Sequence, residues 1–221
     1  MEWQERFTNG QKSKLLSLLR NLLALTIFMV APTMAATIEY DSQLCSAELI
    51  IIQADIKKLD SASTPQIQQI GLQKRIKGAF STLNWLCRRN AAFNNTKAQA
   101  IKLLEIFNSG KRIDLNQQLK TLIQKMPLSL TGLQAKDATA QDITIGKQLY
   151  QQYCRACHIS QNYAVELPAF SLILMAKKLA PAEFIARMLA GVKGTPAIAL
   201  HNPLSKADIA GIYAYLLKAK N

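Results

Sequence analysis

Two cysteines and a histidine stand together in the last third of the chain, at Cys154, Cys157 and His158. One turn of helix would place the three side chains on the same face, where two thiols and an imidazole can meet one ligand. In the order C-x-x-C-H, the thiols add to the two vinyl groups of a haem and the imidazole binds its iron. The chain has only four cysteines and two histidines, so half of these residues lie in one pentapeptide.

A C-x-x-C pair also occurs in redox-active disulfides and in zinc sites. The redox alternative needs a βαβ context, whereas this sequence is dominated by helix-favouring Leu, Ala, Lys, Gln and Ile. The zinc alternative needs two more ligands at matched spacing, and only His201 and two distant cysteines remain. The sequence therefore predicts one covalent haem c, bound through Cys154 and Cys157, with His158 as the proximal iron ligand.

The segment 143–221 resembles the class I monohaem cytochrome c domain. Gly146 and Tyr150 precede the pentapeptide as in the first helix of that family, where the glycine and the aromatic residue pack against the last helix. The chain also ends on a predicted helix with Ser205 as its N-cap, and Tyr215 stands in the family's closing aromatic–leucine pair. The resemblance implies a helical haem domain that carries electrons rather than an enzyme, with Tyr150 among the residues around the cofactor.

The same resemblance points to Pro168 and Thr195 as further cofactor contacts. In the family, a proline about ten residues after the histidine offers its carbonyl to the N–H of the proximal imidazole and so orients the ring. Pro168 stands in that region. The family then usually supplies a methionine sulfur as the second iron ligand, but Thr195 occupies the corresponding position.

Three alternatives for the distal side of the iron arise from that departure. His201 lies on the same predicted loop and would give bis-histidine ligation. Met188, or Met175 further away, would supply a sulfur, although both lie in predicted helices where methionine usually fills core space. In the third alternative no side chain binds the iron, and Thr195 lines an open site. An open site would suit a haem sensor, a gas-binding protein or a peroxidase-like protein.

The residues before the haem segment predict a small helical bundle, which makes the fold all-α. Apolar residues recur at three- and four-residue spacing in 41–59, 65–89, 96–107 and 115–126, and the carboxylates are expected on the polar faces. Cys45 lies near the start of the first helix and Cys87 near the end of the second, so an antiparallel hairpin would bring them together. We expect a Cys45–Cys87 disulfide worth roughly 2–4 kcal/mol, with two buried free thiols as the alternative. The domain boundaries expected are 37–127 for the bundle and 128–142 for a polar linker.

The first 36 residues have the pattern of a cleaved signal peptide. A basic segment is followed by an apolar run at 22–31 and by PTMAA at 32–36, where small residues fit a cut after Ala35 or Ala36. The apolar run is shorter than the ~20 residues that a membrane span needs. We expect export to the periplasm, with an inner-membrane anchor facing the periplasm as the alternative.

The formal net charge is +13, of which the leader contributes two units. An exported protein does not routinely meet nucleic acid, so we expect no nucleic-acid partner. We expect instead a redox partner protein with an acidic docking surface, with peripheral membrane contact and a place in a periplasmic oxidoreductase as further alternatives. A basic collar would steer such a partner; its residues are Lys147, Arg155, Lys177, Lys178 and Lys193. The sequence as a whole predicts an exported cytochrome that carries single electrons between periplasmic partners.

Overall fold

The structure is a computed structural model, and it describes residues 42–88, 90, 93, 95–159, 164–191 and 204–220. The chain divides into two units, 1–40 and 41–221. The first unit, with the predicted signal peptide, lies outside the described residues, and so do Thr195, Lys193 and His201. All of the described residues therefore belong to the second unit.

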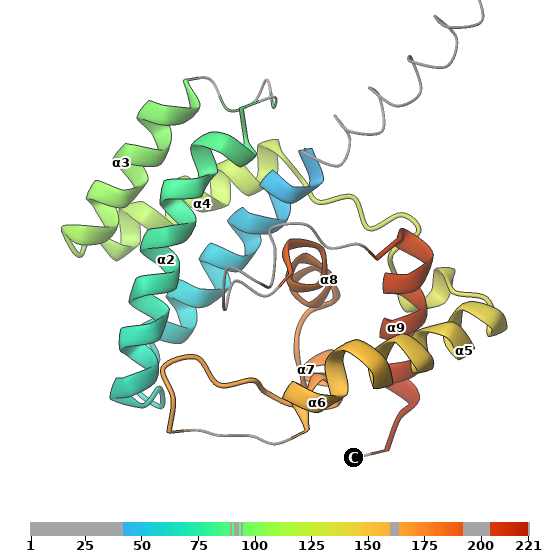
Figure 1. Cartoon of the computed structure of the whole chain (residues 1–221). Helices are drawn as coiled ribbons and strands as arrows, with labels where there is room; N and C mark the ends of the chain where they lie inside the picture. Colours follow the sequence, from blue (N-terminus) through green and yellow to red (C-terminus); the bar gives the residue numbers. More distant parts are fainter. Residues whose placement is uncertain are drawn as a thin grey trace, which may run out of the picture. The chain divides into compact units, whose positions relative to one another are not determined.

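The described residues are helical and contain no strand, which confirms the all-α expectation (Figure 1). A first helix covers residues 42–59. It is followed by α2 (Gln66–Leu86), α3 (Thr96–Asn108), α4 (Arg112–Lys125), η1 (Ala135–Asp137), α5 (Ala140–Leu149), η2 (Tyr150–Cys154), α6 (Arg155–His158), α7 (Leu172–Lys178), α8 (Pro181–Ala190) and α9 (Lys206–Lys218).

The first four helices form the predicted bundle because each has an apolar stripe that faces its neighbours. Phe80 of α2 and Phe107 of α3 are buried, and their ring centroids lie 5.9 Å apart. Leu115 and Leu119 of α4 are fully buried as well. Burial of these side chains is what makes the four helices mutually stabilising.

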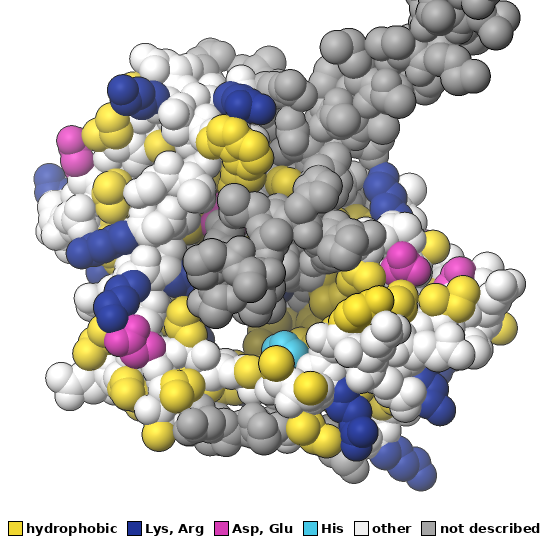
Figure 2. All heavy atoms as spheres, in the orientation of Figure 1, with side chains coloured by type: hydrophobic (Ala, Val, Ile, Leu, Met, Phe, Trp, Pro, Cys, Tyr) yellow, Lys and Arg dark blue, Asp and Glu magenta, His cyan; other side chains and the backbone are white. Residues whose placement is uncertain are grey.

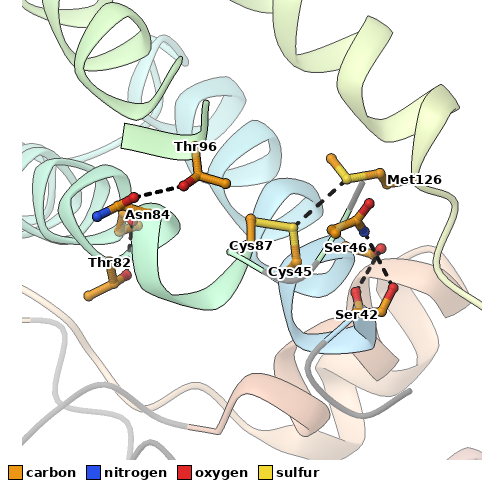
Figure 3. The surroundings of a disulfide bond; sticks show 10 residues. Ser42, Cys45, Ser46, Thr82, Asn84, Cys87, Thr96 and Met126 are labelled. Carbon is orange, nitrogen blue, oxygen red and sulfur yellow. Dashed lines mark hydrogen bonds between the residues drawn. A yellow bond between two sulfur atoms is a disulfide. The ribbon is translucent and has the colours of Figure 1, made fainter. Parts of the chain in front are cut away.

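The predicted disulfide between Cys45 and Cys87 is present, and it joins the helix at 42–59 to the end of α2 (Figure 3). The Cα atoms of the two cysteines are 5.0 Å apart, and both residues are fully buried. The Met126 sulfur lies 4.0 Å from Cys45 Sγ, which is a contact between sulfur atoms because a disulfide has no S–H. The bond therefore sits inside the bundle and fixes the antiparallel hairpin.

In the C-terminal half, α5 and α9 approach each other closely enough that only glycine fits at the crossing. A Cβ added to Gly146 would lie 2.2 Å from the Gly211 carbonyl carbon, and one added to Gly211 would lie 2.1 Å from the Asp142 carbonyl oxygen. Next to this crossing, the Tyr150 and Tyr215 ring centroids are 5.7 Å apart. The expected packing of the glycine and the aromatic residue against the last helix is thus confirmed.

The segment predicted as a linker, 128–142, has structure of its own. Leu133 is fully buried in the hydrophobic cluster around α8 and α9, and Leu128 and Leu130 pack against the same cluster. The segment also contains η1 and the first residues of α5. The polar composition of this segment suggested a linker and did not indicate that three of its leucines pack into the core.

None of the described helices is both long and apolar enough to cross a bilayer.

Candidate functional site

The pentapeptide lies at the end of a continuous helical run in which a π-turn interrupts the α-geometry. Thr139 begins this run as the N-cap of α5, with its side chain accepting a hydrogen bond from the Asp142 amide. The five residues of η2 then have π-helical hydrogen bonding, and α6 resumes at Arg155. A π-turn inserts one extra residue per turn and is frequent at functional sites. It changes the direction of the Cys154 and His158 side chains relative to the buried face of α5.

His158 is held by a hydrogen bond to the chain that returns beneath the pentapeptide. Its Nδ1 atom lies 2.6 Å from the carbonyl oxygen of Phe170. Because a carbonyl oxygen can only accept, Nδ1 carries the proton and Nε2 keeps its lone pair. An imidazole in this tautomer is prepared to bind a metal through Nε2, and the hydrogen bond fixes the orientation of the ring.

This contact differs from the sequence prediction, which gave Pro168 as the acceptor. The structure places the acceptor two residues further along, at Phe170, immediately before the Ser171 N-cap of α7. Ser171 Oγ accepts from the Leu174 amide at 3.4 Å, so the start of α7 fixes where the chain turns. The position of that helix start, which the resemblance did not supply, decides which carbonyl faces the imidazole.

Cys154 and Cys157 are both free thiols, in contrast to the disulfide-bonded pair in the bundle. Cys154 is partly buried and packs against the hydrophobic cluster, whereas Cys157 is exposed. Burial raises the pKa of the Cys154 thiol, and the nearby Cys157 adds to the effect. The pair thus presents one sheltered and one accessible sulfur beside the histidine.

The surroundings of the histidine are apolar. Figure 2 shows a hollow beside the histidine, with hydrophobic side chains at its edge. Leu149, Leu172 and Met175 are partly buried against the same hydrophobic cluster as Cys154 of the pentapeptide. Exposed apolar side chains flank the motif on either side, with Tyr153 67% and Ile159 59% exposed. Two thiols, an imidazole with a free Nε2 and an apolar surround suit a flat, hydrophobic macrocycle that contains iron.

Among the described residues, no group of three or more His, Cys, Asp or Glu is arranged to hold a metal ion. Glu166, in the loop that follows the pentapeptide, is paired with Lys74 of α2, whose Nζ lies 2.7 Å from its carboxylate. Met188 packs against the hydrophobic cluster from α8.

The bundle contributes a buried carboxylate that sequence reasoning missed. Asp55 is 2% exposed and pairs with Arg75 of α2 and with Arg187 of α8, the latter at 2.9 Å. Arg187 also pairs with Glu183 at 2.8 Å, and these carboxylates raise its pKa against the opposing effect of its burial. The expectation that the carboxylates of the bundle lie on polar faces is therefore wrong for Asp55, and also for Glu48 of the same helix, which is 2% exposed. The available signal was an acidic residue between apolar neighbours on the buried stripe of a helix.

The family described as "Cytochrome C oxidase, cbb3-type, subunit III" matches residues 141–216. This segment is a cytochrome c domain. Its cofactor is covalently bound haem c, and its general role is that of a haem-binding electron carrier. The match covers about a third of the chain and leaves the N-terminal region unrecognised. Comparison of the chain with curated proteins and with solved structures gave no match.

The residues of the cytochrome c domain fit haem c by their own chemistry. Cys154 and Cys157 would form the two thioethers, and His158 would present Nε2 to the iron. Tyr150 is buried, and that burial raises its pKa. Its ring packs against Tyr215 of α9 rather than lying at the surface.

Proposed function

We propose that the protein is an exported monohaem c-type cytochrome that carries single electrons between periplasmic redox partners. The observation that supports this most directly is the Nδ1–Phe170 hydrogen bond, which leaves His158 Nε2 free beside two thiols at haem c spacing. The bound haem would supply a one-electron change of its iron. The protein would orient the axial imidazole, exclude water with the apolar surround and leave one sulfur-bearing edge accessible.

We propose His201 as the distal ligand in place of the usual methionine. Thr195 cannot supply a sulfur, and Met188, the alternative, packs against the hydrophobic cluster. An imidazole on both sides of the iron would lower the reduction potential relative to histidine–methionine ligation. An iron without a distal side chain, with Thr195 at the open position, is the second candidate, and it would indicate a haem sensor, a gas-binding protein or a peroxidase-like protein.

The partner that we propose is a redox protein with an acidic docking surface, either free or in the same periplasmic oxidoreductase. Lys147, Arg155 and Lys178 are exposed on the cytochrome c domain. Lys177 is exposed too, although its Nζ donates a hydrogen bond to the Ala219 carbonyl at 2.6 Å. Basic groups near the cofactor edge would accelerate association with an acidic surface, in a manner that salt weakens.

Periplasmic location is likewise our proposal, and two features support it. The first 36 residues have the composition of a cleaved leader. The Cys45–Cys87 disulfide suits an oxidising compartment, where such bonds persist.

Absorption spectra of the ferric and ferrous protein, produced with a cytochrome c maturation system, test the proposal. We expect a low-spin ferric spectrum without the near-infrared methionine band, and conversion to high spin in His201→Ala but not in Met188→Leu. A methionine band lost in Met188→Leu would overturn the His201 ligation. A high-spin spectrum of the unsubstituted protein would favour the open site. Colourless protein with the mass of the bare polypeptide would refute the haem assignment altogether.

A further inference from the structure

The loop segment 164–171, which follows the pentapeptide and contains the acceptor of the His158 hydrogen bond, is contacted by the N-terminal helices. Figure 1 shows this segment, in orange, passing beside one end of α2. The contacts come from α2 and from the helix at 42–59, more than ninety residues earlier in the sequence. They fall on Glu166 and on Phe170.

At Glu166 the contact is between backbones. A Cβ added to Gly71 of α2 would lie 2.3 Å from the Glu166 carbonyl oxygen and 2.6 Å from its carbonyl carbon. Gly71 is buried, so the absence of a side chain there is what allows the loop to lie against the helix. Lys74, on the next turn, adds hydrogen bonds of 2.7 and 2.9 Å to the Glu166 carboxylate.

At Phe170 the contact is between a cation and an aromatic ring. Lys58 Nζ lies 4.0 Å from the centroid of the Phe170 ring. Lys58 is half-buried, and a cation–π contact gains strength as the cation loses water. The ring of Phe170 contacts Lys58, and the carbonyl oxygen of the same residue accepts the hydrogen bond from His158 Nδ1.

We propose that the helix at 42–59 and α2 clamp the loop 164–171 and thereby position the Phe170 carbonyl that orients His158. The N-terminal region is then a structural part of the haem site, and Gly71 and Lys58 are positioning residues for the axial imidazole. A weakened Nδ1 hydrogen bond makes the imidazole a poorer donor to ferric iron, which raises the reduction potential. This inference rests on the proposed ligation by His158 and does not depend on which proteins exchange electrons with the haem.

The decisive variant is Gly71→Ala, and the matched control is Gly78→Ala in the same helix. A Cβ at position 78 would meet nothing within 4 Å. At position 71 the Cβ would have to move by about 1 Å to reach ordinary contact distance, and the opposing atoms belong to backbone. Both variants share the gain in helix propensity of replacing glycine with alanine, so the control removes that effect from the comparison.

The measurements are the exchange rate of the His158 Nδ1 proton and the reduction potential of the haem-loaded protein. Labelling with ¹⁵N-histidine is simple to interpret because the chain has only two histidines. In Gly71→Ala we expect proton exchange about two- to tenfold faster, the range that loss of one ordinary hydrogen bond allows, and a higher potential. Gly78→Ala should match the unsubstituted protein in both. A folded Gly71→Ala protein with unchanged exchange and potential would overturn the clamp.

Lys58→Gln, with Lys57→Gln as its control, keeps the test decisive if Gly71→Ala does not fold. Both lysines lie on the helix at 42–59, but Lys57 is exposed. Faster Nδ1 proton exchange in Lys58→Gln alone would support the clamp, and equal exchange in the two variants would contradict it. Failure of the proposed ligation would be distinct, because the unsubstituted protein would then lack the spectrum of a histidine-bound iron.

Discussion

Replacing Asp55 with asparagine should destabilise the protein strongly, because this carboxylate lies between two arginines from different helices. Asp55 is 2% exposed, and the side chains of Arg75 and Arg187 are 26% and 25% exposed. Arg187 would keep Glu183 as a partner at 2.8 Å. Arg75 would lose its ion pair, and its buried Nε already has no hydrogen-bond partner. The cost of the substitution therefore falls mainly on Arg75.

The expected loss can be worked from the geometry of this network. Removing one partner of a buried ion pair costs about 3–5 kcal/mol. The partial exposure of both guanidinium groups lets water recover some of that, so we take the lower end, about 3 kcal/mol. With an m-value of about 2 kcal/mol per molar urea, the unfolding midpoint should fall by about 1.5 M. In an Arg187→Gln background the same substitution should cost less, since one of the partners has already gone.

Urea unfolding of the haem-loaded, disulfide-bonded protein measures this loss. Asp60→Asn is the matched control, because Asp60 follows the same helix but is 40% exposed and pairs with Arg112 at 3.2 Å. An exposed pair of that kind contributes about 0–1 kcal/mol. An Asp55→Asn midpoint equal to that of Asp60→Asn would refute the reasoning, because the buried carboxylate would then stabilise no more than a solvated one.

Three further predictions concern other parts of the fold. Cys45→Ser with Cys87→Ser should lower the free energy of unfolding by about 4 kcal/mol by the loop-entropy relation, given a separation of 42 residues, and urea unfolding measures it. Gly146→Ala should push α5 away from α9 and lower the free energy of unfolding by about 1–3 kcal/mol or more. A lower Tm together with a changed near-ultraviolet circular dichroism spectrum would show this effect. Hydrogen bonds from the Thr139 side chain and amide hold the pKa of Asp142 below its ordinary value. The Thr139–Asp142 interaction therefore stabilises the fold at pH values above the ordinary pKa of an aspartate, and this stabilisation is lost as the pH falls through the lowered pKa. In Thr139→Ala, an NMR titration should show a higher Asp142 pKa than in the unsubstituted protein.

Local sequence patterns predicted the helices and their ends well. Ser205 begins α9 as expected, with its Oγ accepting from the Asp208 amide at 3.1 Å, because N-cap chemistry involves residues only three positions apart. The Cys45–Cys87 disulfide was predictable because an antiparallel hairpin of two helices brings specific ends together. The haem-binding chemistry of the pentapeptide was predictable as well, because it depends on the local C-x-x-C-H spacing.

Features that depend on contacts between residues far apart in the sequence could not be predicted from the sequence. The acceptor for His158 is Phe170 rather than Pro168 because the start of α7 sets the path of the chain. Gly71 resembles any helical glycine until Glu166, 95 positions later, is seen against it. Asp55 gives no sign in the sequence of which arginines it meets. The π-turn of η2 has no local sequence signature either; its first residue, Tyr150, packs on Tyr215 of α9, which lies 65 positions later.

The bridge between Cys45 and Cys87 has a consequence for how the protein must be made. Under the proposed haem attachment, the chain would need one cysteine pair oxidised while Cys154 and Cys157, which are free, remain available for thioether formation. Four cysteines allow three pairings, so an oxidant that acts before the hairpin has closed would trap thiols needed for cofactor attachment. Recombinant yield should therefore depend on the order in which the oxidase and the haem ligation machinery reach the nascent chain.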